Sequence, residues 1–114
     1  MILGNVCTRG CRFCAVKNGE PLKVDNAEPR KIAEAVAKLQ LKYVVITSVT
    51  RDDLEDKGAG QFSQTILEIK KMNPEIHIEV LIPDFLNDQK SLREVVQAMP
   101  DVIGHNIEMV KRLY

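Results

Sequence analysis

Residues 5–16 read Asn-Val-Cys-Thr-Arg-Gly-Cys-Arg-Phe-Cys-Ala-Val and contain all three cysteines of the 114-residue chain. The cysteines follow the order C-x-x-x-C-x-x-C, which places three thiols on one short loop. A structural zinc site normally takes four ligands, whereas three thiolates suit a 4Fe–4S cluster with one iron left open. The spacing therefore indicates an iron–sulfur site at Cys7, Cys11 and Cys14, and we expect Gly10 to give the loop its close wrap through unusual backbone angles.

Two other interpretations of the three cysteines stay open. A zinc ion could bind them together with a remote fourth ligand, either His77 or His105. The cysteines could also be incidental thiols. We expect His105 to be structural, because a histidine at a strand end more often serves as a hydrogen-bond donor than as a ligand. His77 lies among the alternating residues of the third expected strand, and we assign it no function.

Composition limits the classes of function that the chain can have. The length predicts at most one domain, and 45% hydrophobic residues are ordinary for a globular core. The formal net charge is zero with mixed acids and bases, which gives no electrostatic footprint for nucleic acid. No apolar run reaches the roughly 18 residues of a membrane span, and the first residues lack the basic lead of a signal peptide. We expect a soluble protein of the cytoplasm, or of a mitochondrial or plastid matrix.

Hydrophobic patterns predict strands alternating with helices. Strands are expected at residues 1–6, 43–49, 76–82 and 101–105, and residues 17–26 are expected to form a loop. A first helix enters through Asp25 or Asn26 with Pro29 in its first turn, and others cover residues 61–73, 88–99 and 107–113. The inward-facing residues should be Ile32, Ala33, Val36, Ala37, Leu39, Phe62, Ile66, Ile69, Leu92, Val95, Val96 and Met99.

The alternation of elements predicts an α/β fold with a parallel sheet. The stretch 43–49 is continuously apolar and β-branched until its end, which is typical of a strand buried on both faces. The pattern alone does not separate a flat doubly wound sheet from part of a barrel. Functional sites in either architecture gather at the carboxyl ends of the strands, where the cysteine loop also falls.

The cysteine stretch and four other tracts resemble the lipoyl synthases of the radical S-adenosylmethionine (SAM) superfamily. The matching tracts are residues 4–16, Gly19-Glu20-Pro21, residues 47–54, Pro83-Asp84-Phe85 and His105-Asn106-Ile107-Glu108. The sequence departs from the family at Lys57, where glycine is usual, and at Met109, where threonine is frequent. The resemblance covers essentially the whole chain and implies the first four β/α units of a partial (β/α)6 barrel. Residues 1–114 would then form an incomplete radical SAM core domain.

The resemblance also implies a set of binding residues. Cys7, Cys11 and Cys14 would hold three irons of a 4Fe–4S cluster, and the fourth iron would chelate S-adenosylmethionine. Thr47 and Ser48 would accept hydrogen bonds from the amino group of this cofactor.

Three further residues complete the implied site. Phe13 would pack near the adenine, and Asn106 and Glu108 would bond the ribose or methionine part. Asp52 and Asp53 could bind the ligand, or equally cap a helix or brace a loop, with Arg51 pairing with either, so their roles stay open.

The family's activity is the insertion of two sulfur atoms into a protein-bound octanoyl-lysine group to make lipoyl-lysine. The resemblance therefore implies octanoylated lipoyl-domain proteins or H protein as substrate, and flavodoxin or ferredoxin as electron donor. Lipoyl synthases also carry an auxiliary 4Fe–4S cluster, whose cysteine ligands are absent because no cysteine exists outside Cys7 to Cys14. We expect a fragment, in which Met1 is not the natural start and which cannot insert sulfur alone.

Two alternatives to this function stay open, and one property of the fragment is expected. The alternatives are another radical SAM enzyme, or a non-enzymatic iron–sulfur or zinc-binding module. A truncated barrel exposes the edge of its last strand, which predicts self-association.

Overall fold

The computed structural model describes residues 1–108, 110 and 112. Short strands β1 (Val6–Cys7) and β2 (Lys17–Asn18) precede α1 (Glu28–Lys38) and β3 (Tyr43–Thr47). They are followed by α2 (Ala59–Met72), β4 (His77–Leu81), the 3-10 helix η1 (Phe85–Asn87), α3 (Gln89–Gln97) and β5 (Val102–Gly104). The predicted α/β class and the alternation of strand and helix are confirmed.

The main sheet is parallel, and its strands lie in chain order. The order is β3-β4-β5, with Tyr43 opposite His77 and Glu79 opposite Val102. Ile2 adds a parallel bridge to Ser48, and its backbone N–H donates to the Thr47 carbonyl at 2.8 Å. Strands in sequential order form the wall of a barrel, whereas doubly wound sheets reverse their order. The arrangement is therefore compatible with the predicted partial barrel.

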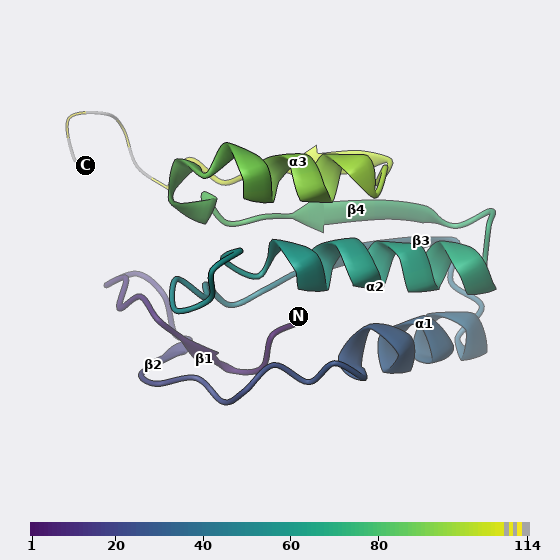
Figure 1. Cartoon of the computed structure of the whole chain (residues 1–114), viewed down its shortest axis with the longest axis horizontal. Helices are drawn as coiled ribbons and strands as arrows, with labels where there is room; N and C mark the ends of the chain where they lie inside the picture. The colour runs from purple at the N-terminus through teal and green to yellow at the C-terminus, as the bar shows by residue number, and fades with distance from the viewer. Residues whose placement is uncertain (109, 111, 113–114) are drawn as a thin grey trace.

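The helices form one layer against this sheet. In Figure 1, α1, α2 and α3 lie side by side and β3 runs behind α2. The α2 residues Phe62, Ile66 and Ile69 are completely buried, which confirms the predicted inner stripe of that helix. The Phe62 ring meets the Phe85 ring edge-on, with centroids 6.3 Å apart. Burial of each such side chain contributes about 1.5–3 kcal/mol, so α2 is the central element of the core.

The opposite face of β3 is open, so the prediction of burial on both faces is wrong. Tyr43 is 49% exposed and Val45 is 53% exposed, whereas Ile46 between the sheet and the helices is buried. The Tyr43 hydroxyl donates to Glu79 of β4 on the open face. A run of β-branched residues predicts a strand, but it does not say whether one or two layers cover it.

Three residues predicted to face inward are exposed. Leu39 and Met99 follow the last residues of α1 and α3, so helical spacing no longer sets their direction. Val96 lies on the solvent side of α3, because its neighbour Val95 takes the buried position.

Residues 1–6 do not form one strand, contrary to prediction. Leu3 has a φ of 68° and Gly4 a φ of 87°, and this left-handed backbone interrupts the extended chain after Ile2. Pairing resumes in β1, which runs parallel to β2 inside the stretch predicted as a loop. The prediction for Gly10 is also wrong, since its φ is not positive; a Cβ there would contact the Asn18 side chain at 3.5 Å.

The ends of two further elements differ from their predictions. Ala27 precedes α1 without a side-chain cap, while the Asp25 carboxylate accepts the Ala27 N–H at 2.9 Å and braces the turn; Pro29 lies in the first turn as predicted. Ile107 and Glu108 are not helical, and Met109, Lys111 and Leu113 of the predicted last helix lie outside the described residues. Within the described part of the chain, no helix is long and apolar enough to cross a membrane. The predicted compartment stays a prediction.

Candidate functional site

The cysteine loop is tied to the carboxyl end of β3. In Figure 1 the arrowhead of β4 points toward the end of the molecule where the N-terminal segment carries β1 and β2. The Thr8 backbone N–H and hydroxyl both donate to the Thr50 carbonyl at 3.1 Å, and the Thr8 hydroxyl accepts the Asp52 N–H at 3.1 Å. The Gly19 N–H donates to the Cys7 carbonyl at 3.1 Å and closes the loop at its base. The loop therefore sits where parallel sheets place their sites.

One cavity of about 360 Å³ lies between this loop and the ends of β3, β4 and β5. It is bordered by all the cluster and cofactor contacts that the family resemblance implies, which are Cys7, Cys11, Cys14, Phe13, Thr47, Ser48, Asn106 and Glu108. Arg9, Asp84 and His105 border it as well. The structure brings the predicted site residues together, and their individual roles stay predictions.

The three thiols differ in their surroundings. Cys7 is buried, whereas Cys11 and Cys14 are exposed. The Cys7 sulfur accepts the Arg9 N–H at 3.4 Å, and the Cys14 sulfur accepts the Val16 N–H at 3.5 Å. These two backbone donors orient the Cys7 and Cys14 sulfurs within the loop.

The positions of the described His, Cys, Asp and Glu side chains distinguish a site for a single metal ion from a site for an iron–sulfur cluster. Among them, no three side chains of His, Cys, Asp or Glu gather closely enough to hold one metal ion. A cluster has a looser requirement, because each thiolate binds a different iron. His77 lies at the start of β4, does not border the cavity, and contacts Asp101 at 3.4 Å. His105 borders the cavity, but its Nδ1 contacts the Ile82 carbonyl at 2.9 Å, as expected for a structural histidine.

Ser48, which borders the cavity, carries an unpartnered hydroxyl. Its Oγ is buried and, within the described part of the chain, has no hydrogen-bond partner. A buried hydroxyl without a partner costs about 1–3 kcal/mol, so such groups in folded proteins call for an explanation. A ligand in the cavity with a polar group near Ser48 would provide one.

A charged network that the sequence analysis missed crosses the rim of the cavity. The Arg9 guanidinium donates to Asp52 at 2.7 and 2.9 Å and to Asp84 at 2.7 and 2.8 Å. These bonds hold the pKa of Asp84 at about 2 and raise the pKa of Arg9. Arg51 instead pairs with Asp53, at 2.8 Å from both of its donor nitrogens. Asp52 and Asp53 thus pair with different arginines, and whether either also contacts a ligand stays open.

Comparison with known proteins identifies the group to which this site belongs. The family described as the radical SAM superfamily matches residues 1–114. The chain belongs to this superfamily. It is 60% identical over 114 residues to the lipoyl synthase of Caldicellulosiruptor saccharolyticus and 57% identical over 114 residues to that of Caldanaerobacter subterraneus. It is 52% identical over 113 residues to the lipoyl synthase of Sulfolobus acidocaldarius. The chain spans 40% of the length of each of these curated relatives.

Membership of the radical SAM superfamily implies a 4Fe–4S cluster and S-adenosylmethionine, and the residues around the cavity fit both. Three cysteine thiols, two of them accepting backbone N–H groups, suit a cluster with one open iron. The unpartnered Ser48 hydroxyl suits a polar cofactor group. Phe13 is 61% exposed and borders the cavity, so its ring is free to pack on a flat base.

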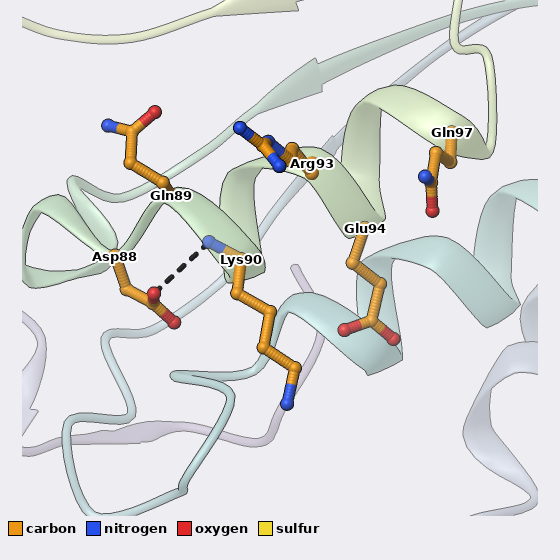
Figure 2. A pocket seen from close by; sticks show the side chains of 6 residues that line it. All are labelled: Asp88, Gln89, Lys90, Arg93, Glu94 and Gln97. Carbon is orange, nitrogen blue, oxygen red and sulfur yellow. Dashed lines mark hydrogen bonds between the residues drawn. The ribbon is translucent and has the colours of Figure 1, made fainter.

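A larger hollow of about 720 Å³ lies outside this site, along α3. Figure 2 shows that its lining side chains project from α3 and from Asp88, the residue before the helix, rather than converging on a point. They carry both charges, and the Asp88 carboxylate accepts the Lys90 N–H at 3.1 Å as part of the helix cap. None of the predicted site residues lines this hollow, which we regard as a solvated helix surface.

Proposed function

We propose that residues 1–114 form an incomplete radical SAM core domain and act as the cofactor-binding part of a lipoyl synthase. The cavity at the strand ends is the observation that carries the proposal, because one space gathers Cys7, Cys11 and Cys14 with the unpartnered hydroxyl of Ser48. The identity of 52–60% to lipoyl synthases over nearly every residue supports this choice within the superfamily.

The residues of the chain have distinct tasks in this proposal. Cys7, Cys11 and Cys14 hold the cluster, and Ser48 and Thr47 accept hydrogen bonds from the cofactor's amino group. When bound, the cluster and S-adenosylmethionine supply the reducing electron and the carbon radical needed to break an unactivated C–H bond.

The other residues bordering the cavity orient the cofactor. Phe13 covers the adenine, and Asn106 and Glu108 bond the ribose or methionine part. Arg9 is outweighed by Asp52 and Asp84, and Glu108 adds a further negative charge at the cavity. A negative surrounding stabilises a positively charged sulfonium ligand.

The activity of the whole protein extends beyond this chain. We propose that the substrate is an octanoyl-lysine on a lipoyl-domain protein or H protein, which receives two sulfur atoms. Flavodoxin or ferredoxin would supply the electron. The sulfur-donating auxiliary cluster needs cysteines that this chain does not contain. The chain alone should therefore cleave S-adenosylmethionine without making lipoyl product.

A turnover experiment tests the proposal. The chain is loaded anaerobically with iron and sulfide, reduced with dithionite and given S-adenosylmethionine, and 5′-deoxyadenosine and methionine are quantified. We expect the unchanged chain to form the two products in equal amounts. The control Arg30→Gln, which removes an exposed ion pair on α1, should do the same. Cys11→Ala should yield neither.

Two results would refute the proposal. Cleavage that survives Cys11→Ala would refute the cluster assignment. Lipoyl product formed by this chain from an octanoylated H protein would refute the division of tasks.

We also propose that the isolated chain self-associates. Beside the open face of β3, the strand β5 exposes 43% of Val102 and 38% of Ile103 at the edge of the sheet. Exposed apolar strand edges pair readily with another chain. Sedimentation should show species larger than a monomer, and a monodisperse monomer at high concentration would contradict this.

A further inference from the structure

Arg9 makes an unusually complete set of contacts for a residue in a surface loop. Its guanidinium donates four hydrogen bonds, two to Asp52 and two to Asp84, at 2.7–2.9 Å. The side chain is 28% exposed, and that of Asp52 is 24% exposed. Bidentate arginine–carboxylate pairs combine strength with a defined geometry, because the planar fork fits the carboxylate in one orientation.

The two carboxylates come from different strands of the sheet. Asp52 follows β3, and Asp84 follows β4, so Arg9 bridges the ends of neighbouring strands. Each aspartate makes one further hydrogen bond. The Asp84 side chain accepts the Leu86 N–H at 2.9 Å, and the Asp52 N–H donates to Thr8 at 3.1 Å. Arg9 therefore binds two carboxylates whose positions are set by the ends of β3 and β4.

Arg9 also lies two residues from both Cys7 and Cys11. Its own N–H donates to the Cys7 sulfur at 3.4 Å, so its backbone and its side chain act on the same loop. Thr8 ties the loop to the end of β3. Among the hydrogen bonds of the described residues, those of Arg9 to Asp84 alone tie the loop to the segment after β4.

We propose that Arg9, held by Asp52 and Asp84, is a positioning residue that fixes the cysteine loop over the ends of β3 and β4. It thereby sets the place of the cluster relative to Ser48, across the cavity that the loop closes. The effect on the cluster rests on the proposed function, whereas the holding of the loop by Arg9 rests on the geometry of the loop alone. Lysine can replace the arginine only in part, because an ammonium group is a point charge and does not hold two carboxylates in a fixed plane.

The first test needs no cofactor. Hydrogen exchange of backbone amides is measured on the chain without iron, for Arg9→Gln, Arg9→Lys, Asp84→Asn and the control Arg30→Gln. Arg30 pairs with Glu34 at 3.0 Å on the exposed face of α1, so its variant removes an arginine–carboxylate pair remote from the loop. We expect exchange in residues 8–16 to accelerate about 10-fold or more in Arg9→Gln, because this variant loses the charge-assisted hydrogen bonds. The acceleration should be smaller in Arg9→Lys and Asp84→Asn, because each of these variants loses only part of them. Exchange in α2 should stay unchanged in all four.

The second test uses the loaded chain. The electron paramagnetic resonance spectrum of the reduced cluster is recorded with and without S-adenosylmethionine, and the affinity for this cofactor is measured. We expect Arg9→Gln to bind iron but to show a diminished spectral change and an affinity about 10-fold lower. Arg9→Lys should be intermediate, and Arg30→Gln should match the unchanged chain.

The outcomes separate this inference from the proposed function. An unchanged chain that takes up no iron refutes the proposed function, while the exchange measurement still decides whether Arg9 holds the loop. An unchanged chain that loads normally, together with an Arg9→Gln variant that has the same exchange and the same spectrum, overturns the inference. If Arg9→Gln does not fold, Arg9→Lys and Asp84→Asn decide in its place. Acceleration throughout α2 in these two milder variants would show a general structural role and overturn it as well.

Discussion

Replacing Ser48 by alanine should have opposite effects on the empty and the occupied chain. Ser48 borders the cavity, and its hydroxyl is buried without a partner within the described residues. Leaving such a group unsatisfied costs about 1–3 kcal/mol, while deleting one oxygen forfeits a few contacts of about 0.1–0.2 kcal/mol each. We therefore expect Ser48→Ala to raise the free energy of unfolding of the chain without cofactor by about 1 kcal/mol.

The effect on cofactor binding should have the other sign. A hydrogen bond to a charged group contributes about 1.5–3 kcal/mol, and 1.4 kcal/mol corresponds to a tenfold change in affinity. Ser48→Ala should therefore weaken the binding of S-adenosylmethionine to the loaded chain by about 10- to 100-fold. Urea unfolding of the empty chain and calorimetric titration of the loaded chain measure the two effects.

Ser91 provides a matched control. Its hydroxyl lies 2.9 Å from the Asp56 carbonyl and 2.6 Å from the Asp88 carboxylate, so it is satisfied and is not among the residues that border the cavity. Ser91→Ala should destabilise the chain by about 1–2 kcal/mol and leave cofactor affinity unchanged. The reasoning is refuted if Ser48→Ala destabilises the empty chain like Ser91→Ala, or if it leaves cofactor affinity intact.

Three further predictions follow from the same contacts. Iodoacetamide should alkylate the exposed Cys11 and Cys14 of the iron-free chain before the buried Cys7, as mapped by mass spectrometry, and equal rates would contradict the structure. Arg9 holds the pKa of Asp84 at about 2, below the unfolded value of about 3.9. The contribution of ionised Asp84 to stability is thus present above pH 4 and is lost as the pH falls toward 2. In Asp84→Asn the free energy of unfolding should therefore fall less steeply with pH in that range. A curve parallel to that of the unchanged chain would count against the ion pair. Gly58→Ala should lower the free energy of unfolding, measured with urea, by more than Gly4→Ala does. Both glycines have left-handed φ values, of 89° and 87°. A Cβ on Gly58 would lie 2.5 Å from Leu3 Cδ1, whereas a Cβ on Gly4 would meet open space. Gly4→Ala should cost only the strain of about 1–2 kcal/mol, and equal losses would show that the contact with Leu3 relaxes freely.

The elements with strong local signals could be predicted from the sequence. The stripe of Phe62, Ile66 and Ile69 defined the buried side of α2, because that helix packs between α1 and α3 and its spacing reports its surroundings. The cysteine spacing placed the site at the strand ends, where the cavity lies. Both signals are contained in short stretches of chain.

The errors arose where distant parts of the chain decide the outcome. Tyr43 and Val45 are apolar or aromatic whichever layer covers them, so their exposure could not be deduced from β3 itself. Leu3 breaks the first strand with a left-handed backbone that its residue type disfavours. The network of Arg9 with Asp52 and Asp84 joins positions 43 and 75 residues apart, and only the assembled sheet brings them together.

Lys57 shows how a departure from the family pattern acquires a physical meaning. The resemblance to lipoyl synthases implies glycine at this position, and Lys57 has a φ of 56°, in the region that glycine occupies without strain. Its ammonium group donates to the carbonyls of Leu54 and Glu55 at 3.0 and 3.1 Å, which offsets part of that strain. The sequence showed the departure, and the backbone conformation explains why glycine suits the site.

The central claim is that Cys7, Cys11 and Cys14 bind a cluster with an open iron, and loading the chain tests it most directly. The chain is reconstituted anaerobically with iron and sulfide in the presence of zinc, and bound metal is analysed with spectra taken before and after adding S-adenosylmethionine. We expect about four irons per chain and a spectral change on adding the cofactor. One zinc per chain, or no bound metal, would contradict the claim.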